Sequence, residues 1–379
     1  MKQDLPPLFQ DLLVIELASV LAGPSVGMFF AELGARVIKV ENPEKGGDVT
    51  RSWKLPQENQ TDTRSAYFSS INWGKESIAL NLKKSADQKV LHQLLVKADI
   101  LLTSFIPGQA ERMGLGAEDL LQQYPRLILG EINGYGKENT RPAYDAIIQA
   151  EAGFMYLNGE GKQIYKMPVA LMDVLAAHQL KEGLLLAFVE RSITGRGKRV
   201  SASLLQSGIS ALVNQASNWL VAGKIPQAIG SAHPNIAPYG SKFPCQDGGW
   251  IVLAVGSDAQ FAALCGLLEE PVPAHFQHNT GRLAERERLE VWLRDRIVLW
   301  KRDELLTQLE AHRVPAGAIN QMPEVMQQPL AEDLQLRSGR FTGLRSIVSE
   351  HQRIELSPPP ALGEHTERIL GELSGDGWG

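Results

Sequence analysis

Cysteine is scarce in this chain, which has only Cys245 and Cys265 among its 379 residues. Two cysteines cannot build the disulfide framework of a secreted domain, so we expect a reducing, cytoplasmic setting. Neither cysteine belongs to a CxxC pair, and no group of cysteines and histidines has the spacing of a zinc site. We therefore expect no bound metal and interpret both cysteines as buried structural thiols.

Positive charge is not in excess, and long apolar runs are missing. The chain holds 38 Lys and Arg against 43 Asp and Glu, whereas a general nucleic-acid binder needs a basic surface. The apolar stretch 12–30 is interrupted by Glu16, Gly23 and Pro24, which does not suit a membrane span. The N-terminus lacks the basic-then-apolar pattern of a signal peptide. These absences predict a cytoplasmic protein that binds neither nucleic acid nor membrane.

What the chain does have is a repeated alternation of apolar strands with helices. Segments typical of strands buried on both faces recur at 12–17, 36–41, 77–82, 99–104 and 126–132. Helices are expected between them, for example at 25–33 and 85–97. A strand, a helix and a strand within about thirty residues form a βαβ unit. The sequence therefore predicts an α/β protein with a Rossmann-like parallel sheet, whose ligands bind at the carboxyl ends of the strands.

The composition changes at 224–241, where Gly, Pro, Asn and His are concentrated. Such a change marks a domain linker or a loop over the site. A strand at 251–255 then opens a second α/β module, with helices expected near 260–268, 283–298 and 302–312.

The first turn argues against a dinucleotide. Glu41 ends the second strand, where NAD enzymes place a ribose-binding acid. However, residues 18–24 read Ala-Ser-Val-Leu-Ala-Gly-Pro and contain no GxGxxG, so the backbone cannot approach a pyrophosphate as that motif requires. NAD binding is therefore disfavoured.

One carboxylate, Asp173, stands in the apolar run 167–178. Residues 168–171 are typical of a short buried strand or an extended segment, and 174–190 of a long helix. At this junction Asp173 is either a helix N-cap, which the local pattern favours, or a reactive carboxylate. The two roles are compatible, because helix-end N–H groups keep a carboxylate ionised and nucleophilic. His178 is interpreted as structural.

Stretches spread over nearly the whole chain follow one another in the order of a known family: 19–24, 33–41, 47–51, 72–83, 105–115, 134–136, 144–145, 149–153, Asp173, 194–197 and 233–239. Together they resemble the class III CoA-transferases, the formyl-CoA transferase or CaiB–BaiF family. The resemblance implies a CoA-binding large domain over 1–223, a small α/β domain over 224–330, and a segment over 331–379 that returns to the large domain. It also implies a homodimer whose chains interlock like links.

The resemblance further implies that Asp173 is the catalytic nucleophile. CoA or acyl-CoA is then a substrate, a carboxylic acid is the second substrate, and no cofactor is bound permanently. The positions matched to CoA binding are Leu21, Ala22, Asn42, Leu80, Asn81, Lys83, Ser104, Phe105, Arg112, Tyr144 and Asp145. Asn42 stands where formyl-CoA transferase has an arginine. Lys83 and Arg112 also have ordinary interpretations, as a solvated lysine and a helix C-terminal arginine.

Two other functions stay open. An acyl-CoA racemase or epimerase needs two acid–base groups that flank the α-carbon, and the family's His–Asp pair falls on Tyr144 and Asp145. A phenol with an ordinary pKa of about 10 is a poor base at neutral pH, which favours transfer. A non-catalytic CoA-binding protein is the other alternative, and the presence of Asp173 argues against it.

The sequence does not identify the acids that exchange CoA. A dicarboxylate such as succinate is the preferred candidate, and carnitine-type and aromatic acids stay open. Its second carboxylate could meet Arg51, Lys75 or Arg141, although each also has a plain surface interpretation. The glycine loop that holds the oxyanion in formyl-CoA transferase is matched only by Gly240 and by Gly248 and Gly249. Formyl or oxalate specificity is therefore disfavoured.

Overall fold

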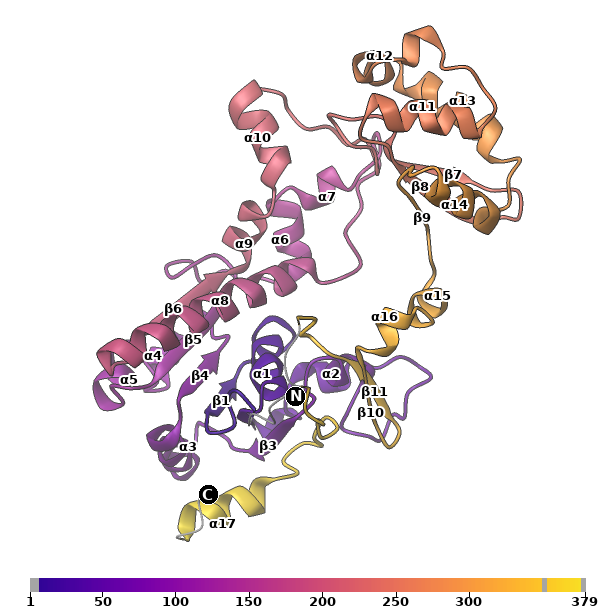
Figure 1. The fold of residues 1–379 in the computed structure, drawn as a ribbon. Coiled ribbons are helices and arrows are strands. Elements are labelled where there is room, and N and C mark those ends of the chain that lie inside the picture. The colour runs from indigo at the N-terminus through magenta and orange to yellow at the C-terminus, as the bar shows by residue number, and fades with distance from the viewer. Residues whose placement is uncertain (1–6, 350–352, 376–379) are drawn as a thin grey trace. The chain divides into compact units, whose positions relative to one another are not determined.

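The computed structural model describes residues 7–349 and 353–375 and divides into two compact units (Figure 1). The first unit comprises the chain up to 152, residues 167–213 and the chain from 333, and the second comprises 153–166 and 214–332. The boundaries expected after 223 and 330 stay a prediction. The short segment 153–166, which the sequence did not single out, belongs with the second unit.

The first unit is built on a six-stranded sheet with the order β3-β2-β1-β4-β5-β6, and every neighbouring pair is parallel. The strands are β1 (Leu13–Leu17), β2 (Arg36–Glu41), β3 (Lys75–Ala79), β4 (Ile100–Thr103), β5 (Ile128–Asn133) and β6 (Arg199–Ser203). The predicted α/β fold with a parallel sheet is therefore confirmed. Strand order reverses between β1 and β4, and open parallel sheets bind ligands at the carboxyl ends of such strands.

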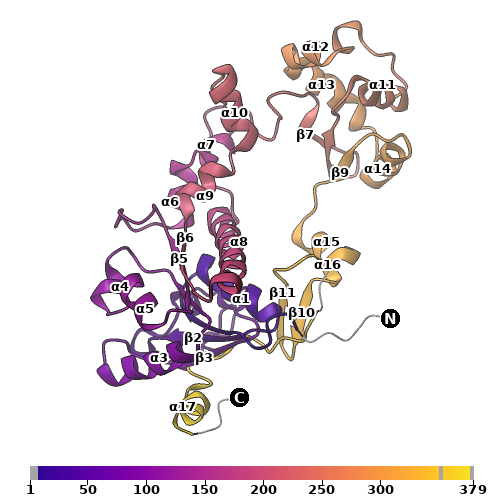
Figure 2. The same ribbon diagram turned by 60° about the vertical axis from the view of Figure 1, so that its left-hand side comes forward.

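Helices cover both faces of this sheet (Figure 2). Helix α1 (Ala22–Glu32) packs with α8 (Leu171–Thr194) on one face, and α3 (Ser85–Lys97) packs with α17 (Thr366–Ser374) on the other. The apolar stripe of α3, with Leu91, Leu94 and Leu95, is buried against alternate strand residues such as Ile15 and Leu101. The helix predicted at 85–97 is confirmed, whereas the one expected from 25 already begins at 22.

Shorter elements complete the first unit: η1 (Pro43–Lys45), η2 (Val49–Ser52), α2 (Ala66–Ser69), α4 (Gln109–Arg112), α5 (Ala117–Gln123), α6 (Asp145–Glu151), α9 (Leu204–Ser210) and the antiparallel pair β10 (Gln335–Ser338) and β11 (Phe341–Leu344). None of the helices in the described part of the chain is long and apolar enough to cross a membrane.

The start of α8 differs from the prediction. Of the two forms expected at 168–171, the buried strand is wrong, because α8 begins at Leu171 and Val169 is 60% exposed. Asp173 is the third residue of α8 and not its N-cap, a position that Ala170 occupies without a side-chain hydrogen bond. The carboxylate of Asp145 instead accepts the backbone N–H of Met172 at 2.9 Å. A carboxylate 27 positions away in sequence thus performs the capping that local pattern assigned to Asp173.

The second unit has an antiparallel sheet in the order β7-β8-β9, with β7 (Tyr239–Pro244), β8 (Trp250–Ala254) and β9 (Ala316–Ala318). Its helices are α7 (Phe154–Leu157), α10 (Val213–Ala222, which begins at the unit boundary), α11 (Asp258–Leu267), η3 (Ala274–Phe276), α12 (Asn279–Ala284), α13 (Arg286–Ile297), α14 (Arg302–Ala311), α15 (Met322–Met326) and α16 (Pro329–Glu332). Cys245 and Cys265 are buried free thiols in its core, as expected for structural cysteines.

Candidate active site

Two neighbouring pockets lie at the carboxyl ends of the parallel strands, and both are formed within the first unit. The Asp173 pocket, of about 210 Å³, is lined by 19–23, 104–107, 132–134, Asn139, 141–144, Asp173 and Leu204. The Lys83 pocket, of about 310 Å³, is lined by 17–19, 39–42, Lys45, 47–48, 80–83, Phe105, Gln109 and Met113. Ser19 and Phe105 line both pockets. This is the edge of the sheet where the strand alternation predicts ligands.

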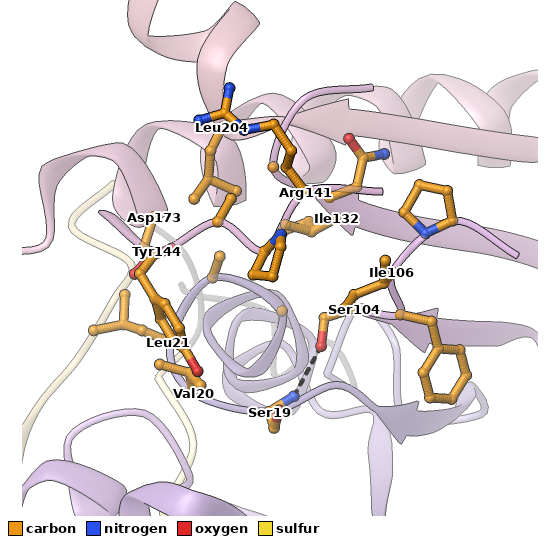
Figure 3. Close-up of a pocket in the computed structure, with 18 of the residues that line it drawn as sticks. Ser19, Val20, Leu21, Ser104, Ile106, Ile132, Arg141, Tyr144, Asp173 and Leu204 are labelled. Carbon is orange, nitrogen blue, oxygen red and sulfur yellow. Dashed lines mark hydrogen bonds between the residues drawn. The ribbon is translucent and has the colours of Figure 1, made fainter. Parts of the chain in front are cut away.

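The structure brings most of the residues predicted from the family together at these pockets. The Asp173 pocket contains Leu21, Ala22, Ser104, Phe105, Tyr144 and Asp173, and the Lys83 pocket contains Asn42, Leu80, Asn81, Lys83 and Phe105. Figure 3 shows Asp173, Tyr144 and Leu21 toward one side of the Asp173 pocket and Ser104 and Ile106 toward the other. Two predicted residues line neither pocket: Arg112 is exposed at the end of α4, and Asp145 is buried.

Asp173 is fixed in place by contacts at the start of α8. Asp145 binds the N–H of Met172 through one oxygen, and its other oxygen accepts a hydrogen bond from Gln149 Nε2 at 2.8 Å. Gln149 also binds both the backbone N–H and the carbonyl of Met167. The segment that leads into the helix is therefore clamped, and Asp173 is held in the first helical turn with 9% of its surface exposed. N–H groups in a first turn favour a carboxylate in its charged form.

The geometry separates the two groups that racemisation would use. Tyr144 lines the Asp173 pocket and is 58% exposed. The neighbouring Asp145 is 7% exposed, and its two oxygens bind Met172 N–H and Gln149. A pair of acid–base groups must both reach the substrate carbon. Asp145 is engaged in holding α8, so the two residues do not form such a pair.

Tyr67, on α2, is a functional candidate that the sequence did not reveal. Burial raises the pKa of Tyr67, and the negative charges of Asp173, Asp145 and Asp48 raise it further. The phenol is therefore a protonated hydrogen-bond donor at neutral pH, within electrostatic reach of Asp173. A single tyrosine in a polar stretch carries no sequence signal that would distinguish it.

Two of the three predicted acid-binding cations are instead structural. Arg51 is 4% exposed, forms a bidentate ion pair with Glu41 at 2.6 and 2.8 Å, and stacks on the ring of Phe68. Lys75 is 1% exposed and binds Glu16 at 2.8 Å, and burial lowers the pKa of Lys75 to about 8. A sequence shows charge but not burial, which is why these predictions were wrong.

Arg141 is the predicted cation that lines the Asp173 pocket. Its side chain is exposed, pairs with Glu151 at 2.6 Å and lies over the ring of Tyr135 at 4.5 Å. The pair with Glu151 raises the pKa of Arg141, so the guanidinium is charged at every working pH.

The Lys83 pocket contains two exposed cations, Lys83 and Lys45. Lys45 was not predicted from the sequence as a binding residue, although it belongs to η1, which follows β2 directly, and therefore lies at the ligand edge of the sheet. Asn42, where formyl-CoA transferase has an arginine, uses its side-chain oxygen to cap η1 through Glu44 N–H at 2.9 Å. Lys45 thus brings a positive charge to the pocket that Asn42 cannot supply.

Glu41 does not act as a ribose-binding acid. Its carboxylate accepts hydrogen bonds from Arg51, Ser77 Oγ and the backbone N–H of Asp48. Burial alone would raise the pKa of Glu41, but the hydrogen bonds and charge of Arg51 and the charge of Lys39 outweigh burial and lower this pKa. All its acceptor capacity is directed into the protein, which agrees with the missing GxGxxG.

The remaining candidates lie elsewhere. Gly240 is in β7, and Gly248 and Gly249 are in the turn before β8, all three in the second unit. His178 is exposed on α8 and does not line the Asp173 pocket. No three His, Cys, Asp or Glu side chains form a metal-binding group within the described ranges 7–349 and 353–375.

Comparison with known proteins identifies the family. The model of CoA-transferase family III matches residues 9–366. The succinate–glutarate CoA-transferase of Agrobacterium fabrum is 35% identical, with 97% of this chain and 96% of the relative covered. The human succinyl-CoA:glutarate CoA-transferase is 32% identical, with 95% of this chain and 84% of the relative covered. A crystal structure of a CaiB/BaiF family protein from Brucella suis matches with a TM-score of 0.84 and 35% identity, covering 96% of this chain and 98% of that one. The chain belongs to CoA-transferase family III and is an enzyme that transfers CoA between CoA thioesters and acids.

Proposed function

We propose that this enzyme moves CoA from a dicarboxylic acyl-CoA such as succinyl-CoA to a second carboxylic acid through a covalent intermediate on Asp173. The observation that carries the proposal is the position of Asp173, in the first turn of α8 and in the lining of a pocket at the strand ends. The names of the two relatives, which both act on succinate or succinyl-CoA and glutarate, support a dicarboxylate.

In the first half-reaction, a carboxylate oxygen of Asp173 attacks the thioester carbonyl carbon of the donor. The carbon–sulfur bond breaks, and CoA leaves as a thiolate, so that a mixed anhydride joins Asp173 to the acyl group. The thiolate then attacks the aspartyl carbonyl carbon. The donor acid leaves as a carboxylate, and an aspartyl-CoA thioester remains.

The second half-reaction reverses these steps with the acceptor acid. The acceptor carboxylate attacks the aspartyl thioester, the CoA thiolate leaves, and a second anhydride forms. The thiolate attacks the acceptor's carbonyl carbon, which releases the new acyl-CoA and restores the carboxylate of Asp173. Each step exchanges groups of similar energy, and no net proton or electron is consumed, so neither ATP nor a permanently bound cofactor is needed.

Backbone N–H groups are suited to hold the negative oxygen of each tetrahedral intermediate. Leu21 and Ala22, at the start of α1, line the Asp173 pocket, and no side chain caps that helix end. Preorganised N–H donors of this kind stabilise a developing oxyanion.

The Lys83 pocket is suited to the nucleotide end of CoA. Lys45 and Lys83 would meet phosphate groups, which attract exposed lysines as point charges. Because Ser19 and Phe105 line both pockets, a single CoA molecule can extend from the Lys83 pocket to Asp173. Arg112 lies outside both linings, so its matched role in CoA binding has no support from the pocket geometry.

Arg141 is suited to the second carboxylate of a dicarboxylic acid. It lines the same pocket as Asp173, and its planar guanidinium can bind a carboxylate through two parallel hydrogen bonds. Arg141 would exchange its ion pair with Glu151 for the incoming acid, or bind both.

The proposal includes a Rossmann-like large domain, a cytoplasmic location and an interlocked homodimer. The strand order of the first unit supports the Rossmann-like description, because it is the order of the two-halved dinucleotide-binding sheets. Apolar side chains that a single chain leaves exposed support an interface: Leu186, Val189 and Ile193 on α8, and Leu220 and Val221 on α10.

The test replaces Asp173 by asparagine, which keeps shape and removes the nucleophile. We expect the rate of CoA transfer from succinyl-CoA to glutarate to fall by at least about a thousandfold, while the Kd for CoA, measured by calorimetry, is retained. Glu190→Gln is the matched control, because it removes an exposed carboxylate at the other end of α8. Transfer that survives in Asp173→Asn would refute the proposal.

The same assay separates the alternatives. A racemase would exchange the α-proton of a 2-methylacyl-CoA with deuterated water, and we expect no such exchange. A non-catalytic CoA-binding protein would bind CoA without forming any new acyl-CoA, which the wild-type assay with glutarate detects directly.

A further inference from the structure

A network of six buried charged side chains reaches the Lys83 pocket, whose lining includes Lys39, Glu41 and Asp48, and the mechanism above uses none of the six. The network consists of the carboxylates Glu16, Glu41 and Asp48 and the cations Lys39, Lys75 and Arg51, and each of the six residues is at most 4% exposed. The carboxylates balance the cations in number. Removing ions from water is costly, so such a cluster in a fold suggests a purpose beyond packing.

The network holds the loop 18–21 that joins β1 to α1. Lys39 Nζ donates to the carbonyl of Ala18 at 2.8 Å and pairs with Glu16 at 2.8 Å and with Asp48 at 3.0 Å. Both oxygens of Asp48 lie 3.3 Å from the backbone nitrogen of Val20. On the pocket side, the N–H of Ser19 donates to Ser104 Oγ at 3.1 Å (Figure 3).

Val20 adopts a conformation that valine avoids. Its φ is +72°, in the left-handed region that β-branched residues rarely adopt. Such a conformation persists only where its surroundings enforce it. Here it turns the Val20 N–H toward buried Asp48, while 19–21 line the Asp173 pocket and 18–19 line the Lys83 pocket.

Asp48 is itself rigidly held. Its Oδ1 accepts hydrogen bonds from the N–H and the hydroxyl of Thr50 at 3.0 and 2.8 Å, and its N–H donates to Glu41 at 2.9 Å. Burial opposes ionisation of Asp48, but Lys39 prevails and lowers its pKa. The carboxylate is charged, and its oxygens are engaged by Lys39, Thr50 and Val20, although one side of the residue lines the Lys83 pocket.

We propose that Asp48 is a positioning residue for CoA transfer, which together with Lys39 holds the loop 18–21, with Val20 in the left-handed conformation, in the geometry that the CoA thioester requires. This proposal rests on the proposed placement of the thioester in the Asp173 pocket. Asp48 acts through the loop, because its two oxygens are engaged by Lys39, Thr50 and the backbone N–H of Val20.

The experiment uses Asp48→Asn, Val20→Gly, the double variant and Ser77→Ala in the full-length enzyme. We expect Asp48→Asn to raise the KM for succinyl-CoA by roughly tenfold or more, since a held loop is replaced by one that must be ordered on binding. Glycine adopts positive φ without strain. The double variant is therefore expected to have a KM for succinyl-CoA close to that of the wild type.

Ser77→Ala is the matched control. Ser77 Oγ donates to Glu41 at 2.6 Å within the same network, but it does not touch the loop. Its KM for succinyl-CoA is expected to stay near that of the wild type even where its melting temperature falls. An equal rise in KM in Ser77→Ala would assign the effect to general destabilisation and overturn the proposal.

Two further outcomes would also overturn it. If the folded Asp48→Asn enzyme has an unchanged KM for succinyl-CoA, Asp48 does not position the loop. If its KM is raised and the added Val20→Gly change does not lower it again, Asp48 contacts the substrate directly. If Asp48→Asn does not fold, the proposal is tested by measuring the rate of amide hydrogen exchange at 18–21 in the wild-type enzyme without CoA. Protection is expected, and rapid exchange contradicts the proposal. A KM effect with no covalent adduct at Asp173 would refute the proposed function alone.

Discussion

The two units of this chain bury different kinds of side chain. Among the described residues of the second unit, the buried polar or charged side chains are Ser241 and Arg282. Its core is an apolar cluster. The first unit buries a network of acids and bases, three of which line the Lys83 pocket. Both units fold around apolar cores, so folding alone does not require buried charge. Three of the buried ions of the first unit, Lys39, Glu41 and Asp48, lie at the ligand edge of the sheet, in the lining of the Lys83 pocket.

Arg282 shows what an isolated buried cation does. Its guanidinium donates to the carbonyls of Ala237 and Phe276 at 2.8 and 2.9 Å and pairs with Asp258 at 2.7 Å. It fixes the backbone of loops, and it lines neither of the two pockets described above. The network of the first unit performs a comparable task for the loop 18–21, but that loop also forms the walls of both pockets.

The largest expected effect on stability comes from Glu41→Gln. The change leaves Arg51 buried beside a neutral amide, and breaking one side of a buried ion pair costs about 3–5 kcal/mol. The free energy of unfolding, measured by urea titration at pH 7, is expected to fall by that amount.

The loss should depend on pH. The pKa of Glu41 is lowered in the folded protein, so the group contributes stability that is fully present above its unfolded pKa of about 4.3 and is lost as pH falls through the folded value. The difference between wild type and Glu41→Gln is therefore expected to shrink from pH 6 to pH 3. A constant difference would contradict the charged state assigned to Glu41.

A matched change in the second unit should behave differently. Leu293 is fully buried in the apolar cluster, and Leu293→Ala is expected to cost about 2–5 kcal/mol through lost burial and a cavity. Because no titrating group is involved, that cost should be the same from pH 6 to pH 3. If the stability loss in Leu293→Ala shrank with falling pH as it does in Glu41→Gln, the two units would not differ in the pH dependence of their cores.

The smallest expected effect is that of Arg141→Gln, because the side chain is exposed. We expect the KM for glutarate to rise by up to about fivefold, the range of an exposed ion pair, with no change for a monocarboxylic acceptor of the same length. Glu151→Gln, which releases Arg141 from its partner, should lower the KM for glutarate. An equal change for both acceptors would exclude Arg141 from recognising the second carboxylate.

Much of the first unit could be predicted from periodicity, since strands buried on both faces and amphipathic helices such as 85–97 leave a clear pattern. The family match also placed most site residues in the two pockets. Prediction failed where the interacting residues are distant in sequence, or where a residue's role depends on whether its side chain is buried. Asp145 caps α8 from 27 residues away, and Arg51 and Lys75 read as surface cations although they are buried. Lys45 joins the lining of the Lys83 pocket only through the fold.

The central claim is that CoA is carried on Asp173, and trapping tests it most directly. The enzyme is incubated with succinyl-CoA alone and treated with borohydride, which reduces an aspartyl thioester to the alcohol, and its peptides are then analysed by mass spectrometry. We expect Asp173 to be converted to homoserine in the peptide that spans the start of α8, and only when succinyl-CoA is present. An unmodified Asp173 in an enzyme that still transfers CoA would contradict the account.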